Sequence, residues 1–180
     1  MPSTDQFQIA LREVLRHEGG VSDNKFDPGG YTNKGITLRT AIDNNLDMDG
    51  DGDVDRADVR NLSDEAVSRL YKSKYWNACE CDKLPPGLSL MVFDLAVNSG
   101  PTRARRMLQQ ALGVTVDGVL GPKTLDAAQR ADTRYTIEQM RMLRERFYRS
   151  LSDFQHFGNG WLRRLAGVYA ASLYLAGVRK

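Results

Sequence analysis

The sequence has few cysteines and histidines, and this scarcity argues against several kinds of site. Its 180 residues contain two cysteines, Cys79 and Cys81, and two histidines, His17 and His156. Only one residue separates the cysteines, and a disulfide bond across so short a loop would be strained, so we expect two free thiols. With only His17 and His156 to join the two cysteines, we do not expect a zinc site.

The sequence also contains no long hydrophobic run, and its first residues do not show the pattern of a signal peptide. No stretch reaches the ~18 apolar residues that a membrane-spanning helix needs, and residues 1–6 lack a basic segment followed by an apolar run. We therefore expect a soluble protein made in the cytoplasm without a signal peptide. If it acts on the cell envelope, another factor must release it. The length predicts one domain, or one domain made of two lobes.

The charge is unevenly distributed along the chain. Residues 1–100 carry 11 basic and 17 acidic side chains, whereas residues 101–180 carry 14 basic and 6 acidic ones. A basic half is compatible with binding nucleic acid, an anionic membrane or an anionic cell-wall polymer. On charge alone, solvated helix faces are the better explanation of these arginines.

Apolar residues recur mostly at helical spacing, which predicts a mainly α protein with two lobes and one cleft. The expected helices are residues 3–18, 38–45, 63–76, 88–97, 102–112, one starting at 122, 133–151 and 161–176. Residues 22–35 lack a helical period and suit a loop or a short hairpin. The helix at 88–97 is apolar on nearly all sides, so we expect it to be central and buried. The Pro-Pro-Gly sequence at 85–87 predicts a boundary between an N-terminal lobe, 1–84, and a helical C-terminal lobe, 85–180.

Glu18 is the first candidate for chemistry. It follows Val14 and Leu15 by four and three residues, so it continues the apolar stripe of the first predicted helix. A carboxyl group at the edge of an apolar face loses hydration, which favours its protonated form and lets it donate a proton to a leaving glycosidic oxygen. Two glycines follow and let a sugar chain approach. The alternative is a structural ion pair with an arginine.

Asp27 and Thr32 are the candidates for handling a water molecule. Asp27 lies nine positions after Glu18, in the region predicted to be a loop or hairpin. A second carboxylate there can orient or deprotonate water, and a threonine hydroxyl can hold that water. The alternative is structural, because Asp before Pro-Gly-Gly is a common turn former.

Residues 47–58 read Asp-Met-Asp-Gly-Asp-Gly-Asp-Val-Asp-Arg-Ala-Asp. Acidic residues occupy loop positions 1, 3, 5, 7, 9 and 12, and Gly52 occupies position 6, where the chain must turn sharply. This is the EF-hand pattern, because Ca²⁺ takes six to eight oxygen ligands, and aspartate at position 12 resembles dockerin loops. The alternative is a solvated acidic loop, in which six acids would repel one another. We predict Ca²⁺ as the cofactor, with these ligands: Asp47, Asp49, Asp51, Asp53 and Asp58.

Two further groups have a functional and a structural interpretation. Tyr31, Tyr75 and Trp76 can stack on sugar rings, although aromatic residues at helical spacing more often belong to a core. The basic C-terminal helix around Trp161 and Arg163 can touch an anionic membrane, although its regular apolar spacing favours packing.

Several ordered motifs carry a resemblance to a known family. They are His17-Glu18-Gly19-Gly20, Asp27-Pro28-Gly29-Gly30, Thr32-Asn33, Gly35-Ile36-Thr37, Tyr75-Trp76, Phe93-Asp94, Ala96-Val97-Asn98-Ser99-Gly100, Leu108-Gln109, Asp117-Gly118 and Gly121-Pro122-Lys123-Thr124. Together they closely resemble glycoside hydrolase family 108, the muramidases of phages and bacteria. The order Glu18, Asp27, Thr32 also resembles the triad of phage lysozymes, in which one more residue separates the Asp from the Thr.

The resemblance implies a lysozyme-like fold with a central buried helix and at most a small hairpin. It implies catalytic roles for Glu18, Asp27 and Thr32, and a peptidoglycan-binding region in the C-terminal lobe. Substrate-binding roles are expected for Tyr31, Asn33, Tyr75 and Asn98.

The expected activity is that of an endolysin, which cleaves the N-acetylmuramic acid β-1,4 N-acetylglucosamine bond with Glu18 as the general acid. The expected partner is bacterial peptidoglycan, without nucleic acid or stable membrane association, and the protein is expected to be a monomer that acts at the cell wall or periplasm. Two alternatives remain open. One is a lytic transglycosylase that uses Glu18 alone, and the other is a non-catalytic, calcium-dependent wall-binding module.

Overall fold

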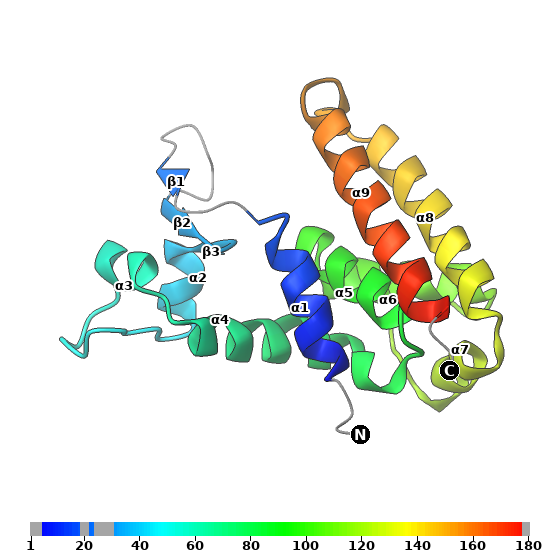
Figure 1. The fold of residues 1–180 in the computed structure, drawn as a ribbon, viewed down its shortest axis with the longest axis horizontal. Coiled ribbons are helices and arrows are strands. Elements are labelled where there is room, and N and C mark those ends of the chain that lie inside the picture. The colour runs from blue at the N-terminus through cyan, green and yellow to red at the C-terminus, as the bar shows by residue number, and fades with distance from the viewer. Residues whose placement is uncertain (1–4, 19–21, 24–30, 178–180) are drawn as a thin grey trace. The chain divides into compact units, whose positions relative to one another are not determined.

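The computed structural model describes residues 5–18, 22–23 and 31–177 (Figure 1). The chain divides into two compact units, Val14–Lys72 and a second that joins Met1–Glu13 to Ser73–Lys180. This division differs from the predicted lobes 1–84 and 85–180. The short helical turns before Pro85 contact the helix that follows Gly87, so the chain stays inside one compact unit at this point.

The described chain is mainly α-helical, as the sequence predicts. The unit Val14–Lys72 contains these elements: β1 (Ser22–Asp23), β2 (Tyr31–Asn33), β3 (Ile36–Thr37), α2 (Leu38–Asp43), α3 (Arg56–Arg60) and α4 (Asp64–Tyr71). The other unit contains most of α1 (Gln6–Leu15) and these elements: η1, a π-helical turn (Lys72–Trp76), η2 (Asn77–Cys79), η3 (Cys81–Lys83), α5 (Leu88–Ser99), α6 (Pro101–Leu112), α7 (Pro122–Arg130), α8 (Thr133–Arg149) and α9 (Phe154–Gly177).

Helix α5 is the centre of the larger unit, and its burial confirms the prediction from its apolar sequence. Every residue from Leu88 to Ala96 is buried, and α5 contacts α6, α8 and α9. The rings of Phe7, Trp76 and Phe93 meet edge to face beside it, with centroids 5.3–5.9 Å apart. Trp76 has no exposed surface, so its core interpretation is confirmed and the sugar-stacking one is wrong.

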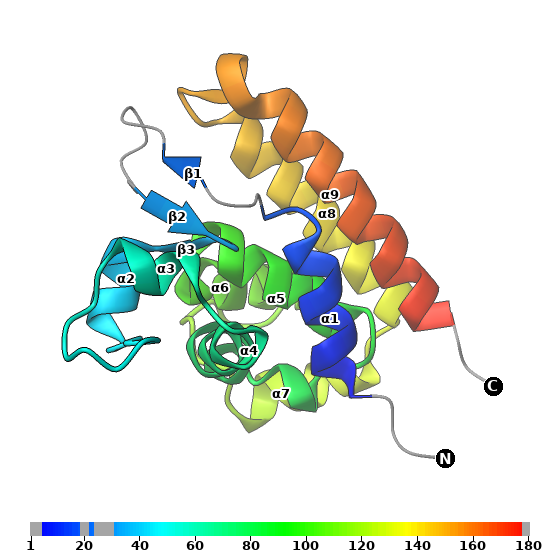
Figure 2. The same ribbon diagram turned by 60° about the vertical axis from the view of Figure 1, so that its left-hand side comes forward.

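Helices α8 and α9 lie side by side in both views (Figures 1 and 2). The predicted break at 157–160 is wrong, because α9 runs unbroken through it. Gly158 serves close packing instead, since a Cβ added there would lie 2.6 Å from the Phe154 ring one turn earlier. Within the described residues, no helix combines the length and the apolar character needed to cross a membrane.

The first helix ends earlier than predicted. Helix α1 stops at Leu15, and the N–H of His17 bonds to the carbonyl of Val14 at 3.0 Å, which tightens the last turn. Glu18 therefore lies in the bend after the helix instead of on its apolar stripe. The predicted cap at Ser3 falls outside the described residues, and the Asp5 carboxylate accepts from the N–H of Phe7 at 3.0 Å.

The sheet is small and antiparallel, in the order β1-β2-β3. The sequence predicted a loop or a hairpin, and β1 adds a third, two-residue strand to the hairpin of β2 and β3. Asn33 pairs with Ile36, so only Lys34 and Gly35 form the turn. Both have positive φ, 49° and 74°, which is the type I′ geometry that matches the twist of a hairpin.

Candidate active site

The carboxylate of Glu18 lies against the turn between β2 and β3. A Cβ atom added to Gly35 would lie 2.7 Å from Oε2 of Glu18 and 3.0 Å from its Cδ. Glu18 is half-buried, while Gly35 is exposed. The absence of a side chain at Gly35 therefore lets the Glu18 carboxylate pack directly against the turn.

Tyr71, the last residue of α4, contributes its hydroxyl to the same place. The added Cβ at Gly35 would collide with this hydroxyl oxygen as well. The side chain is 1% exposed, and its O–H donates to the carbonyl of Lys34 at 2.9 Å. Because this bond holds the left-handed residue of the turn, Tyr71 fixes the position of Gly35 beside Glu18.

Thr32, a predicted catalytic residue, lies in the central strand β2. It pairs with Ser22 on one side and Thr37 on the other. Successive side chains of a strand point to opposite faces, so Thr32 faces away from its buried neighbours Tyr31 and Asn33. Its half-exposed side chain is on the face of the sheet that is free of α3.

Tyr31 and Asn33, predicted to bind substrate, lie on the face that packs against α3. The amide of Asn33 donates to the carbonyls of Val59 and Arg60 at 2.8 and 3.2 Å. The Tyr31 hydroxyl accepts from Arg60 Nε at 3.2 Å, and the ring is 5% exposed. These bonds attach α3 to the hairpin, and a role in substrate binding stays a prediction for both residues.

The remaining predicted residues lie either outside the described residues or in the other compact unit. Asp27 lies outside the described residues. Tyr75 is half-buried in η1, where the Lys74 ammonium lies 5.8 Å from its ring centroid. Asn98, exposed near the end of α5, accepts from the Tyr148 hydroxyl at 2.8 Å. Both belong to the other compact unit.

Sequence reasoning did not assign a role in the site to Gly35 or Tyr71. Gly35 carried a signal, since glycine in a two-residue turn between short strands indicates a positive φ. Tyr71 carried none beyond its apolar periodicity, which predicts burial but not a bond to a carbonyl 37 positions earlier in the chain.

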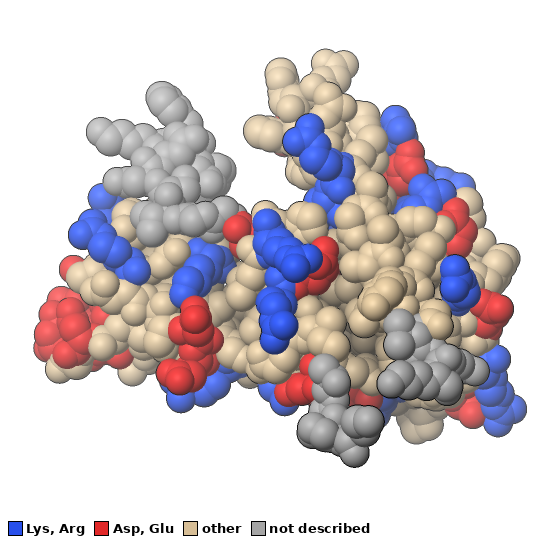
Figure 3. All heavy atoms as spheres, viewed as in Figure 1, with Lys and Arg blue, Asp and Glu red and all other residues tan. Residues whose placement is uncertain are grey.

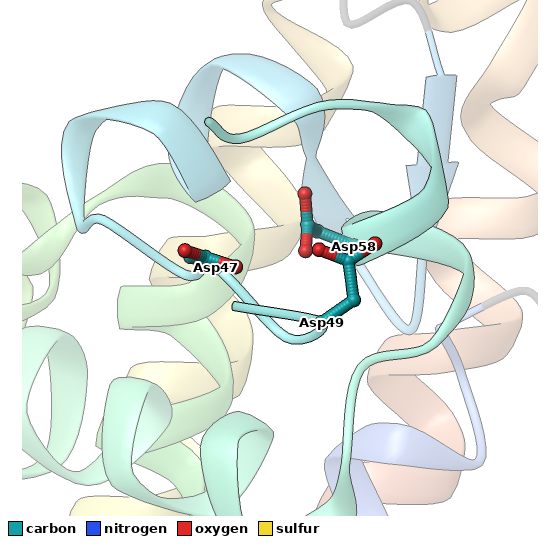
Figure 4. A group of neighbouring side chains, drawn as sticks. All are labelled: Asp47, Asp49 and Asp58. Carbon is teal, nitrogen blue, oxygen red and sulfur yellow. The ribbon is translucent and has the colours of Figure 1, made fainter. Parts of the chain in front are cut away.

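The acidic loop between α2 and α3 forms an acidic patch on the surface (Figure 3), and its carboxylates fall into two groups. Asp47, Asp49 and Asp58, drawn in Figure 4, each place an oxygen within 4.8 Å of the others, and Asp53, Asp55 and Asp58 do the same. Asp58 is common to both and is 1% exposed. Asp51, a predicted ligand, is in neither group, and its carboxylate accepts from the N–H of Asp53 at 3.0 Å.

The backbone wraps around these carboxylates. Asp47 accepts from the N–H of Gly50 at 2.6 Å and of Gly52 at 3.2 Å. Gly52, predicted at the sharp turn, has φ of 95°. Such a φ strongly favours glycine, which explains why the loop position requires it.

The pKa values in the loop follow from these contacts. The Asp51 charge, together with lost hydration and further acidic neighbours, raises the pKa of Asp53 above its ordinary value. The N–H groups of Asp55 and Met48 instead lower the pKa of Asp58 by bonding its carboxylate. Asp58 is therefore held ionised at the centre of a cluster of like charges, an arrangement that a bound cation stabilises.

Comparisons with known proteins cover nearly the whole chain. Residues 11–100 match a family model described as Glycosyl hydrolase 108, and residues 103–166 match one described as Predicted Peptidoglycan domain. The solved structure titled "Structure of Brucella abortus SagA" is 35% identical, with 97% of this chain and 98% of that chain covered and a TM-score of 0.84. Comparison with curated proteins gives no match. The residues that match the first family model include Glu18, the hairpin and the acidic loop, and those that match the second include α7 and α8.

Proposed function

The chain belongs to the glycosyl hydrolase 108 family, and from this premise we propose that it is a muramidase with Glu18 as its general acid. The family makes it a glycoside hydrolase, and the second matched region supports peptidoglycan as the polymer it acts on. The proposed bond is the β-1,4 linkage from N-acetylmuramic acid to N-acetylglucosamine. The observation that carries the proposal is the Glu18 carboxylate beside the exposed Gly35.

Glu18 protonates the leaving glycosidic oxygen in this mechanism. Its half-buried position limits hydration but leaves part of the side chain accessible to a sugar ring, and the lack of a side chain at Gly35 lets the turn pack directly against the carboxyl group. Tyr71 keeps the turn in place through the Lys34 carbonyl. A general acid held at the correct distance contributes roughly 10²–10⁴-fold to the rate.

Asp27 and Thr32 complete the proposed mechanism. Thr32 presents its half-exposed side chain on the face of the sheet opposite Tyr31 and Asn33, where it can hold a water molecule. Asp27 then serves as the second carboxylate. An inverting enzyme uses that carboxylate to activate the water, and a retaining one uses it to attack the sugar. The anomeric configuration of the first product, measured by NMR, separates the two.

Calcium is the proposed cofactor of the loop from Asp47 to Asp58. Oxygens that share one Ca²⁺ at roughly 2.4 Å can lie at most about 4.8 Å apart, and both carboxylate groups meet this limit. Asp55 and Asp58 also cap α3, and α3 is bonded to β2 through Asn33. Calcium held by the loop would therefore stabilise the hairpin that positions Glu18.

Comparing Glu18→Gln with wild type on purified peptidoglycan tests the proposal. Glutamine keeps the shape but cannot donate the proton, so we expect the lysis rate to fall by roughly 10²–10⁴-fold at an unchanged melting temperature. Glu65→Gln, an exposed carboxylate in the first turn of α4, is the control and should lyse normally.

Mass spectrometry of the released fragments then identifies the reaction. A muramidase adds water and leaves a reducing muramic acid end. An anhydro-sugar end would assign the protein to the lytic transglycosylases instead. Sedimentation with peptidoglycan without any release of fragments would favour the wall-binding module, and normal lysis by Glu18→Gln would exclude Glu18 as the acid.

A further inference from the structure

A groove of about 690 Å³ lies between α6 and α8, inside the unit that contains Ser73–Lys180. Three arginines from the two helices line it, Arg103 and Arg106 from α6 and Arg146 from α8. Met107 and Leu143 supply apolar lining, with Met107 only 6% exposed. The groove therefore combines concentrated positive charge with an apolar surface.

Among the described residues, no carboxylate oxygen lies within 4.0 Å of the three arginines Arg103, Arg106 and Arg146. Three other arginines of α8 are paired: Arg141 with Glu138 and Glu145, Arg149 with Glu145 and Arg144 with Asp94. Acidic residues thus pair with arginines elsewhere on the same helix, but in the described part of the chain none of them pairs with the groove arginines.

The neighbouring contacts orient the arginines without neutralising them. The guanidinium of Arg103 lies over the Phe147 ring, 4.0 Å from its centroid, which holds the cation at the groove while its N–H edge stays available. The side chain of Gln109 and the N–H of Val119 donate to one oxygen of Asp117 at 2.7 and 2.8 Å and lower the pKa of this carboxyl group; the charge of Arg106 lowers it further without forming an ion pair with it.

The groove continues into a second hollow of about 280 Å³, which shares Ser99, Arg103 and Phe147 with it. Trp161 and the predicted substrate-binding residue Asn98 line this second part. An elongated, partly aromatic and cationic groove fits an extended polymer with anionic branches better than it fits a small ion.

We propose that the groove between α6 and α8 is a subsite for the peptide stems of peptidoglycan, with Arg106 and Arg146 binding their free carboxylates; this rests on the proposed function. The guanidinium group is planar and matches a carboxylate with two parallel hydrogen bonds. The aliphatic parts of the stem side chains fit the lining from Met107 and Leu143. All these residues lie within 103–166, the region matched as a peptidoglycan domain.

The test compares two polymers free of teichoic acid: intact sacculi, and glycan strands from which an amidase has removed the stems. Co-sedimentation on ice is measured for the full chain carrying Glu18→Gln, to limit digestion. The test variant adds Arg106→Gln and Arg146→Gln. Its control adds Arg130→Gln and Arg163→Gln, which remove the same charge from exposed positions outside the groove.

We expect the groove variant to bind intact sacculi on the order of tenfold more weakly, the size expected from two exposed charge contacts. Binding to stem-free strands should not change, and the control should match its parent on both polymers. Unchanged binding to sacculi, or an equal loss on stem-free strands, would overturn the proposal. So would a loss that appears only when teichoic acid is added, because the groove would then bind phosphate.

The outcome is separable from that of the muramidase proposal. If wild type releases no fragments from either polymer, the proposed activity fails while the binding comparison still decides the role of the groove. If wild type lyses sacculi and the groove variant binds like its parent, only the subsite fails.

Discussion

Asp94 and Arg144, fifty positions apart in the chain, form an ion pair in which neither side chain is exposed to solvent. Arg164 of α9 donates to the second oxygen of Asp94 at 2.9 Å. The Nε of Arg144 donates to the Tyr148 hydroxyl at 2.6 Å, and that hydroxyl donates to Asn98. One carboxylate of α5 thus joins α8 and α9 to the centre of the larger unit.

Asp94→Asn is expected to destabilise the protein strongly. The amide leaves Arg144 buried without a full counter-charge, and breaking a buried pair in this way costs about 3–5 kcal/mol of the free energy of unfolding. Urea denaturation measures the loss. Asp126→Asn, which breaks the exposed pair with Arg130, is the control and should cost less than about 1 kcal/mol. A loss for Asp94→Asn as small as that of the control would contradict the expected cost.

Acid should remove part of this stabilisation. Burial raises the pKa of Asp94, but the charges of Arg144 and Arg164 outweigh it and leave the pKa below its ordinary value. A carboxyl group whose pKa is lower in the folded than in the unfolded protein stabilises the folded state at pH values above its unfolded pKa of about 4. This stabilisation is lost as the pH falls through the folded pKa. The free energy of unfolding, measured with urea, should fall more between pH 7 and a pH below 4 in wild type than in Asp94→Asn. Equal losses would mean that Asp94 does not contribute.

Gly35→Ala should reduce activity with Glu18 intact. The new methyl group would collide with the Glu18 carboxylate and the Tyr71 hydroxyl, and a displacement of about 1 Å costs on the order of 100-fold in kcat. Gly113→Ala is a matched control, because Gly113 also has a positive φ, 67°, but open space around it. In both variants, alanine in the left-handed backbone conformation lowers the free energy of unfolding by roughly 1–2 kcal/mol. Only Gly35→Ala should lose activity at a temperature where both are folded; similar lysis rates would separate Gly35 from the site.

Calcium should raise the melting temperature. At a hundred times its dissociation constant, it stabilises the folded state by about 2.7 kcal/mol, which is a rise of roughly 5–10 °C for a chain of this size. Asp47→Ala with Asp49→Ala should abolish the rise and slow lysis. Asp43→Ala with Glu65→Ala, exposed acids of the same unit outside the loop, should keep it. Identical melting curves with calcium and with chelator would make the loop an acidic surface turn.

The two thiols should be inert in the folded protein. Burial raises the pKa of Cys79 to about 12 and that of Cys81 well above its ordinary value, so neither forms the reactive thiolate near neutral pH. A coloured disulfide reagent at pH 8 should label neither thiol until denaturant is added, and then both. Rapid labelling without denaturant would show that the region opens readily.

Local sequence patterns predicted correctly the elements in which burial is uniform from one end to the other. The apolar run at 88–97 predicted a buried helix, and α5 is buried from Leu88 to Ala96. The free thiols were predicted from their spacing and are confirmed. The break predicted at 157–160 was wrong, because glycine lowers helix stability only modestly, and at Gly158 the packing of Phe154 outweighs that cost.

The sequence by itself determined the mainly α class, the central helix and the family motifs that include Glu18. These depend on residues that are close together in the chain, so periodicity and spacing record them. Only the tertiary structure decided which partners meet: Arg144 with Asp94, Tyr71 with the carbonyl of Lys34, and Gly35 with the carboxylate of Glu18. A buried charge or hydroxyl must find a partner, but packing between distant elements decides which one, and no local pattern records that choice.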